Sequence, residues 1–285
     1  MKNTVDLHVH SSCSDGTCTP SELVSYAKKQ GLCAFALTDH DTTAGIDEAA
    51  AAAAKLGVEL IAGIEFSTEY HGRDIHIVGL DIDYNSAVFS KELSRFRSSR
   101  ALRNQKMIRK LREEGGIDIS AKQMQERFGE SVWTRAHFAR YLFEHGYVSE
   151  MWDAFKTYVG EDCPYFVPRE KVTPAQAVDL ILRTGGIPIL AHPLLYALDE
   201  PDMDELILSL KKCGLIGLET FYATYTPLEE LHALRLAEKH GLLPSGGSDF
   251  HGSNKPDINL GSGRGNLSLP YELLQNLRDR RTHYE

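Results

Sequence analysis

The sequence predicts an α/β fold: a barrel-like set of about seven strand–helix units, interrupted once by an inserted helical cap. Two observations support this prediction. Strand patterns alternate with helix patterns near both ends of the chain, which favours a sheet covered by helices. The long stretch between these regions shows helix patterns alone. The predicted domains are a discontinuous barrel, residues 1–86 and 171–285, and a helical cap, residues 87–170.

The first predicted strand shows the clearest pattern. Between residues 5 and 10, apolar side chains alternate with Asp6, His8 and His10, which is typical of a strand with one apolar and one polar face. His8 and His10 therefore point to the same side. The other predicted strands cover residues 33–38, 58–67, 74–82, 186–192, 215–221 and 243–249.

Helix starts are marked by hydroxyl side chains. Thr19, Thr173 and Thr226 each precede a proline, with a glutamate or glutamine three positions after the threonine, and this capping box starts a helix. Further helices are expected at 44–56 and 203–213. In the cap, a long basic helix precedes hydroxyl N-caps expected at Ser120, Thr134 and Ser149.

Composition places the chain among ordinary globular proteins. It has 285 residues, 42% of them hydrophobic, and 31 basic against 40 acidic side chains give a net charge of −9. The first residues do not resemble a signal peptide, and no apolar run reaches the roughly 20 residues of a membrane span, so we expect a cytoplasmic protein that does not engage a membrane. The five cysteines form no C-x-x-C pair, which argues against a disulfide framework or a thiolate zinc site.

One segment is strongly basic. Residues 91–112 hold nine lysines and arginines against a single acid, Glu92. Two interpretations stay open: a solvated helix face, or a surface that meets an anionic ligand.

Potential metal ligands follow or lie in most of the predicted strands. The C-terminal rim is where barrel enzymes build their active sites. So many histidines and acids on one rim are hard to explain by core packing, because each would need its own buried hydrogen-bond partners. The residues are His8, His10, Asp15, Asp39, His40, Glu65, His76, His192, Asp249 and His251.

The ligand types predict which ions bind. Imidazole nitrogen and carboxylate oxygen without sulfur suit Mn²⁺, Fe²⁺ or Zn²⁺. Three divalent ions match the number of ligands, with Glu65 and Asp249 as bridges that hold a metal-bound hydroxide. With Asp15 as the third carboxylate, one hydroxide and one phosphate dianion would balance the charge. This favours hydrolysis of phosphate monoesters.

Six segments, in order, resemble the motifs of the PHP (polymerase and histidinol phosphatase) superfamily of metal-dependent phosphoesterases: DLHVHSSCSDG, ALTDHDT, GIEFS, DIHIVGL, AHP and GGSDFHG. The resemblance implies a distorted (β/α)7 barrel with a trinuclear site. One ion would take His8, His10, Glu65 and Asp249; the second would take Glu65, His76 and His192; the third would take Asp15, His40 and His251. Asp39 would orient a ligand from outside this set.

The inserted segment is similar to the cap of a bacterial subgroup that dephosphorylates nucleoside 3′,5′-bisphosphates such as pAp and includes RNase AM, a 5′→3′ exonuclease. There a basic cap residue holds the second phosphate of the substrate. The candidates here are Arg135, His137 and Arg169. The alternatives are a surface ion pair for Arg135 and a first-turn helix residue for His137. Tyr225 stands where many relatives carry a histidine.

The sequence therefore predicts a phosphoesterase acting on nucleotides or short oligonucleotides, without a stable protein partner. A histidinol-phosphate phosphatase is an alternative within the superfamily, and a non-catalytic PHP module that binds nucleic acid or protein is an alternative from another class. We expect Trp133 and Trp152 to lie in the core of the cap.

Overall fold

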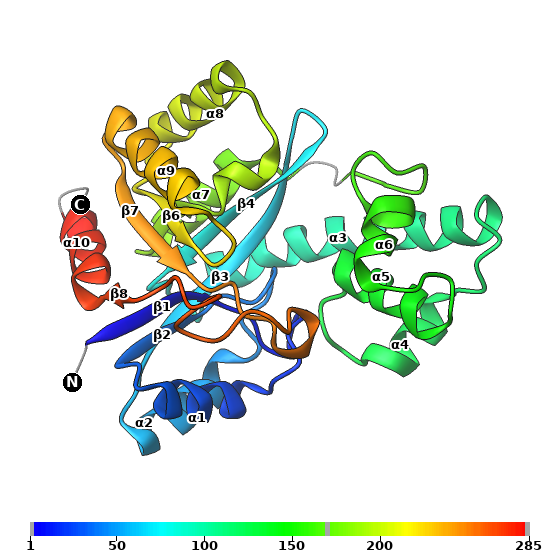
Figure 1. Cartoon of the computed structure of the whole chain (residues 1–285), viewed down its shortest axis with the longest axis horizontal. Coiled ribbons are helices and arrows are strands. Elements are labelled where there is room, and N and C mark those ends of the chain that lie inside the picture. Colours follow the sequence, from blue (N-terminus) through cyan, green and yellow to red (C-terminus); the bar gives the residue numbers. More distant parts are fainter. Residues whose placement is uncertain (1–2, 169–171, 283–285) are drawn as a thin grey trace.

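The computed structural model describes residues 3–168 and 172–282. They form an eight-stranded sheet in the order β7-β6-β5-β4-β3-β2-β1-β8, with helices on its outer side (Figure 1). The predicted α/β barrel class is confirmed. The strands are β1 (Thr4–Val9), β2 (Ala34–Leu37), β3 (Glu59–Tyr70), β4 (Arg73–Leu80), β5 (Ile187–Leu190), β6 (Gly217–Tyr222), β7 (Leu243–Gly247) and β8 (Leu269–Pro270).

The sheet departs from a regular barrel at β4. β1, β2 and β3 run parallel, as do β5, β6 and β7, but β4 is antiparallel to both of its neighbours. The sequence predicts a turn around residues 71–73 between these two strands, but not their relative direction. A tight hairpin joins β3 to β4, because His71 and Gly72 both adopt positive φ, 51° and 84°, as a two-residue hairpin turn requires.

The barrel closes between β7 and β1. The carbonyl of His8 accepts a hydrogen bond from the backbone N–H of Asp249 (2.9 Å), and the N–H of His10 donates to the carbonyl of Phe250 (3.0 Å). A Cβ on Gly247 would lie 2.4 Å from the Cβ of His8, so only glycine allows this approach. The buried carboxylate of Asp6 accepts the backbone N–H (2.8 Å) and hydroxyl (2.5 Å) of Ser248 across the same junction.

Helices cover the outside of the barrel (Figure 1). The capping boxes at Thr19, Thr173 and Thr226 are present, as predicted. The last helix and β8 were not anticipated from the sequence. The covering helices are α1 (Pro20–Gln30), α2 (Ile46–Leu56), α7 (Pro174–Arg183), α8 (Glu200–Lys212), α9 (Pro227–His240) and α10 (Tyr271–Thr282), with short 3₁₀ turns η2 (Pro193–Tyr196) and η3 (Gly252–Asn254).

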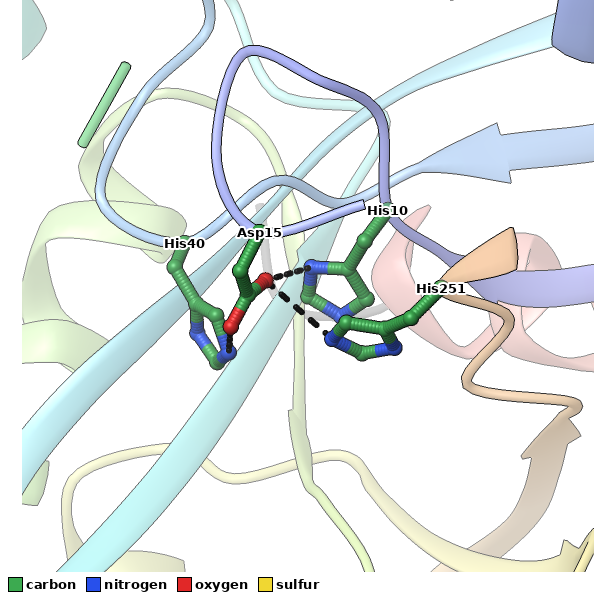
Figure 2. A group of neighbouring side chains, drawn as sticks. All are labelled: His10, Asp15, His40 and His251. Carbon is green, nitrogen blue, oxygen red and sulfur yellow. Dashed lines mark ion pairs between the residues drawn. The ribbon is translucent and has the colours of Figure 1, made fainter. Parts of the chain in front are cut away.

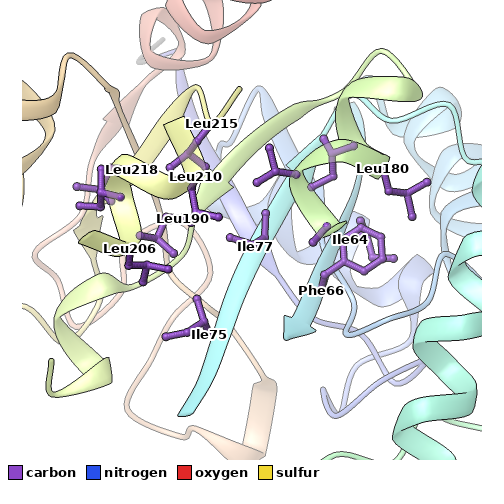
Figure 3. Close-up of a cluster of buried hydrophobic side chains, with 14 of the residues drawn as sticks. Ile64, Phe66, Ile75, Ile77, Leu180, Leu190, Leu206, Leu210, Leu215 and Leu218 are labelled. Atoms are coloured by element: carbon purple, nitrogen blue, oxygen red, sulfur yellow. The ribbon is translucent and has the colours of Figure 1, made fainter. Parts of the chain in front are cut away.

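The largest hydrophobic core lies between the strands and α7 and α8 (Figure 3). Ile75 and Ile77 on β4 contribute to it together with Leu206 and Leu210 on α8. Burial of such side chains stabilises the fold by roughly 1.5–3 kcal/mol each. This core keeps the strands rigid and so fixes the rim that carries the polar residues.

The cap contains α3 (Ala87–Glu113), α4 (Ala121–Phe128), α5 (Arg135–Glu144), α6 (Met151–Ala154) and a π-helical turn, η1 (Phe155–Val159). It has its own hydrophobic core, to which α3 and α5 both contribute. Ser149 does not cap α6, contrary to expectation: Glu150 is the residue before the helix, and the Ser149 hydroxyl donates to Asp153.

Helix α3 belongs to both parts of the molecule (Figure 1). Its first half packs on the barrel, where the ring of Phe96 lies 4.6 Å from that of Phe66, whereas Met107 and Leu111 lie in the core of the cap. The predicted boundary at residue 87 stays a prediction. Within the described ranges, no helix has the length and apolar character needed to cross a membrane.

Candidate metal centre

The predicted ligands meet at one rim of the barrel. His8 lies on β1 and His10 follows it, and their rings are 5.1 Å apart, as the alternation along the strand predicts. His40 follows β2 and pairs by its backbone with Glu65 on β3. His192, Asp249 and His251 follow β5 and β7, and His192 and Asp249 have positive φ angles, which cost conformational energy in residues other than glycine.

His76 reaches this rim because of the direction of its strand. The strand predicted at 74–82 contains His76 near its start, and in the structure His76 lies within the antiparallel strand β4, opposite Ser67. Because the hairpin reverses the chain direction, the first half of β4 lies beside the second half of β3. His76 Nδ1 is therefore 2.9 Å from Glu65 Oε1.

Glu65 is the centre of the cluster. Among the described residues, five imidazoles approach its two carboxylate oxygens. Oε1 lies 2.9 Å from His76 and 3.1 Å from His192. The distances from Oε2 are 3.1 Å to His40, 3.2 Å to His10 and 3.3 Å to His8. A carboxylate in this position suits a bridge between cations.

A second carboxylate, Asp15, organises the neighbouring group (Figure 2). Its oxygens lie 3.1 Å from His251 Nε2, 3.7 Å from His40 Nε2 and 3.8 Å from His10 Nδ1. The described residues offer three groups with ligand atoms within 4.8 Å of one another: His10, Asp15, His40 and His251; His8, His10 and Asp249; and His40, Glu65 and His76. These overlap the three sets that the resemblance implied, but His10 and His40 each belong to two groups.

Buried polar atoms of the cluster that lack hydrogen-bond partners indicate that it can bind metal ions. Four buried side-chain atoms have no hydrogen-bond partner among the described residues: His8 Nε2, His10 Nε2, Asp15 Oδ1 and His192 Nδ1. Buried polar atoms are nearly always hydrogen-bonded. Three of these atoms lie 3.1–3.3 Å from another ligand: His8 Nε2 and His10 Nε2 face Glu65, and Asp15 Oδ1 faces His251. Nitrogen and oxygen atoms placed in this way are suited to bind divalent transition metals.

Two pKa shifts favour the forms that bind metals. Burial lowers the pKa of His40 well below its ordinary value, so that its imidazole is neutral and keeps a lone pair. Burial alone would raise the pKa of Asp249, but the Lys255 ammonium, 2.5 Å from Oδ2, and the imidazoles of His251 and His8 together hold the pKa well below its usual range. Asp249 is therefore ionised.

Asp39 acts from outside the cluster. Its Oδ1 accepts hydrogen bonds from the Ser11 N–H (2.7 Å) and the Ser14 hydroxyl (2.6 Å), and its Oδ2 accepts from the Ser11 hydroxyl (2.6 Å). The Ser14 hydroxyl lies 3.5 Å from His10 Nδ1. Asp39 thus fixes the loop that leads to Asp15 and reaches His10 through Ser14.

Three residues next to the cluster, Glu219, Tyr222 and Lys255, were not predicted from the sequence. Glu219 on β6 is buried, with Oε1 3.0 Å from His8 Nδ1, and its Oε2 accepts the His192 backbone N–H at 2.7 Å. The Tyr222 hydroxyl donates to Asp249 Oδ2 at 2.6 Å, beside Lys255. The available signal was an acid inside the predicted strand 215–221, where burial demands a partner.

A cavity of about 1020 Å³ opens above the cluster and is lined by several cations. Arg100 and Arg103, both buried, come from the basic segment, which is thus only partly a solvated face. Arg100 donates to Asp41 Oδ2 (2.8 Å) and to the Ser67 hydroxyl (2.6 Å). Both arginines lie in an apolar stripe of α3 that repeats every seven residues, and this position in the sequence could have predicted their burial. The stripe contains Phe89, Leu93, Phe96, Met107 and Leu111.

The predicted substrate-binding residues have different positions. Arg135 lines the cavity, with an ion pair to Asp74 at 3.1 Å. His137 is buried, and its Nδ1 accepts the Thr134 N–H at 3.0 Å, which caps α5. Arg169 lies outside the described residues. Tyr225 is buried, and its hydroxyl accepts the Leu194 N–H at 3.0 Å, so it supports η2.

Imidazoles and carboxylates gathered at the rim of an α/β barrel define a protein built around a metal centre. The family model described as PHP domain matches residues 6–240, and the chain belongs to this family, as its motifs predicted. It is 41% identical to a 5′-3′ exoribonuclease of Haemophilus influenzae, over 88% of this chain and 91% of that protein. It is 34% identical to a 3′,5′-nucleoside bisphosphate phosphatase of Chromobacterium violaceum, over 90% of each.

A solved structure has the same fold. It is described as an amidohydrolase from Chromobacterium violaceum with bound sulfate and no metal. The two chains align over 97% of this chain and 96% of that one, with a TM-score of 0.85 and 34% identity. The alignment includes both barrel and cap.

Proposed function

We propose that this protein is a metal-dependent phosphoesterase that hydrolyses phosphate monoesters of nucleotides, above all nucleoside 3′,5′-bisphosphates. One observation carries the proposal. A single cavity is lined both by the imidazole–carboxylate cluster and by Arg100, Arg103 and Arg135. A molecule with two phosphates presents one group to each.

The nine predicted ligands would hold up to three Mn²⁺, Fe²⁺ or Zn²⁺ ions, with Glu65 and Asp249 as bridges. When bound, such ions lower the pKa of water toward about 7 and polarise phosphoryl oxygens. Tyr222 and Lys255 both contact Asp249 Oδ2, which fixes the direction of Oδ1 toward His8 and His10. Lys255 also lines the cavity, where its ammonium attracts the substrate phosphate.

Arg135 would hold the second phosphate. Its ion pair with Asp74 and its position 5.4 Å from the ring centroid of Phe166 keep the guanidinium in place before the substrate arrives. Charge-assisted hydrogen bonds from arginine to phosphate are among the strong ones in proteins. His137 supports this contact by capping the helix that begins with Arg135.

The relatives extend the proposal to oligonucleotides, because one of them is named for 5′-3′ exoribonuclease activity. Removal of one nucleotide after another from a 5′ end is consistent with a basic helix beside the cavity that attracts the rest of the strand. The expected cytoplasmic location and independence of a protein partner remain predictions.

A histidinol-phosphate phosphatase is disfavoured, since a substrate with one phosphate gives no use for three arginines in the cavity. A non-catalytic module is disfavoured because all nine predicted ligands gather at one rim. The test is phosphate release from adenosine 3′,5′-bisphosphate, AMP, histidinol phosphate and a 5′-phosphorylated oligonucleotide, with manganese and after chelation. Preference for histidinol phosphate, or release that chelation leaves intact, would refute the proposal.

A further inference from the structure

The cavity is lined in part by apolar side chains. Met151, Trp152 and Phe155 from the cap line it, together with Leu195 from η2 of the barrel, and we call these four residues the apolar lip. Trp152 is 64% exposed and Leu195 is 53% exposed. The prediction that both tryptophans lie in the cap core is therefore wrong for Trp152, whereas Trp133 does pack against that core.

The exposure of the apolar lip needs a reason. Met151 and Phe155 are half-buried against the cap core, so the exposure comes from Trp152 and Leu195. Single exposed hydrophobic residues are normal, but two that lie at one cavity beside further apolar side chains indicate a binding surface. Elsewhere the cavity wall is mainly polar and carries Arg100, Arg103, Arg135 and the ligand cluster. The Trp152 ring is also held in place, because Lys156 Nζ lies 5.6 Å from its centroid and the Phe155 ring lies 6.5 Å away.

We propose that the apolar lip binds the nucleobase of the substrate and that Trp152 stacks on it. The inference rests on the proposed function. With one phosphate at the ligand cluster and the second at the arginines, the base is the part of the molecule that still needs an apolar surface. A volume of about 1020 Å³ is at the upper end for a small-molecule site and accommodates a whole nucleotide.

The chemistry of the apolar lip determines the expected selectivity. Stacking uses the ring face that every base has, so it raises affinity without choosing among the bases. Such tolerance is what an enzyme needs in order to work along a strand of mixed sequence.

The kinetic test compares substrates with and without a base. Trp152→Ala is expected to lower kcat/KM for adenosine 3′,5′-bisphosphate by roughly 5- to 100-fold, the effect of removing one stacked aromatic. The loss for the base-free deoxyribose 3′,5′-bisphosphate is expected to be at least five-fold smaller. Trp152→Phe restores most of the activity, since a ring remains. Phe143→Ala is the matched control, because Phe143 is an exposed cap aromatic (44%) that is not part of this cavity wall.

A binding test does not depend on turnover. The chain has two tryptophans, so Trp133→Phe leaves Trp152 as the only one. Titration of the manganese-loaded variant with AMP is expected to quench the Trp152 fluorescence, and ribose 5-phosphate is expected to leave it unchanged.

Equal losses on both substrates in Trp152→Ala, or no quenching by AMP, would overturn the inference. The proposed function fails in a different way, namely if the wild-type protein releases no phosphate from any nucleotide. In that case the fluorescence titration still decides whether Trp152 meets a base.

Discussion

Replacing Glu219 by glutamine is expected to weaken metal binding about 10- to 100-fold, the usual range for a partner of a metal-binding histidine. In the structure, Glu219 Oε1 pairs with His8 Nδ1 at 3.0 Å while Oε2 accepts the His192 backbone N–H at 2.7 Å. Because a carboxylate only accepts, it holds the His8 proton on Nδ1. His8 Nε2, the atom that faces Glu65 and Asp249, is then free to bind a cation.

Glutamine reverses this arrangement. The backbone N–H of His192 only donates, so the single amide oxygen stays with it and the amide NH₂ turns toward His8. Nδ1 must then accept, which moves the proton to Nε2 and blocks the metal-binding atom. A 10- to 100-fold loss corresponds to about 1.4–2.7 kcal/mol, a magnitude typical of one misdirected buried hydrogen bond.

The assay is elemental analysis of metal per chain after dialysis at graded free manganese, with phosphate release measured on the same samples. For Glu219→Gln, the midpoint, which is the free manganese concentration at half-saturation, is expected to rise about 10- to 100-fold. Excess manganese is expected to restore much of the activity. Glu229→Gln is the matched control, because it replaces the same side chain by the same amide in an exposed capping box, away from the cluster. A Glu219→Gln midpoint within two-fold of the wild type would refute the reasoning.

Three further predictions follow from the same geometry. Arg135→Ala is expected to lower kcat/KM for adenosine 3′,5′-bisphosphate, with a loss of about 2–4 kcal/mol of transition-state stabilisation. The value for p-nitrophenyl phosphate is expected to change little. Equal losses for both substrates in steady-state kinetics would contradict a contact between Arg135 and the second phosphate. Glu65→Gln removes a charge shared by five imidazoles, so turnover is expected to fall by orders of magnitude and metal content to drop, whereas His71→Asn in the hairpin turn stays within a few-fold of the wild type. Burial lowers the pKa of His137 to about 4, below the ordinary 6.5. Because the unfolded chain takes up this proton more readily, stability is full above pH about 6.5 and falls by at most about 3 kcal/mol toward pH 4. Thermal melts of His137→Gln, which keeps the capping box, are expected to depend less on pH over this range; an unchanged dependence would assign the acid sensitivity to other groups.

The parts of the structure that were predictable from sequence are those fixed by local periodicity. Alternation along β1 placed His8 and His10 on one face, and capping boxes located three helix starts. Residue types were sufficient to expect a nitrogen and oxygen cluster at one rim. None of these inferences needs knowledge of which strands are neighbours.

Features that depend on long-range packing were not predictable. The direction of β4 depends on its pairing with β3 and β5, so the position of His76 beside Glu65 was implied only by the resemblance. The position of Arg100 and Arg103 in the apolar stripe of α3 is a local signal of burial, but only the tertiary structure shows that this part of the stripe faces a cavity. Trp152 differs in the other direction: its hydrophobicity predicted burial in the cap core, but its ring is exposed at the cavity, where we propose that the base of the substrate covers it.

The shared helix α3 determines how this architecture is divided for protein engineering. A chimaera that exchanged the insertion at residue 87 would remove Phe96 from the barrel core and Arg100 from its contact with Asp41. The packing of the barrel core and the contacts next to His40 would then change along with the substrate specificity that the exchange was meant to alter. A junction at Gly115 and Gly116, after α3, keeps both of these contacts. The transplanted helices must then pack on Met107 and Leu111 of α3 and must keep a hydroxyl at position 134, because the Thr134 hydroxyl donates to Asp15 Oδ2 at 2.7 Å. The unit that can be inherited or exchanged separately is therefore smaller than the segment inserted in the sequence.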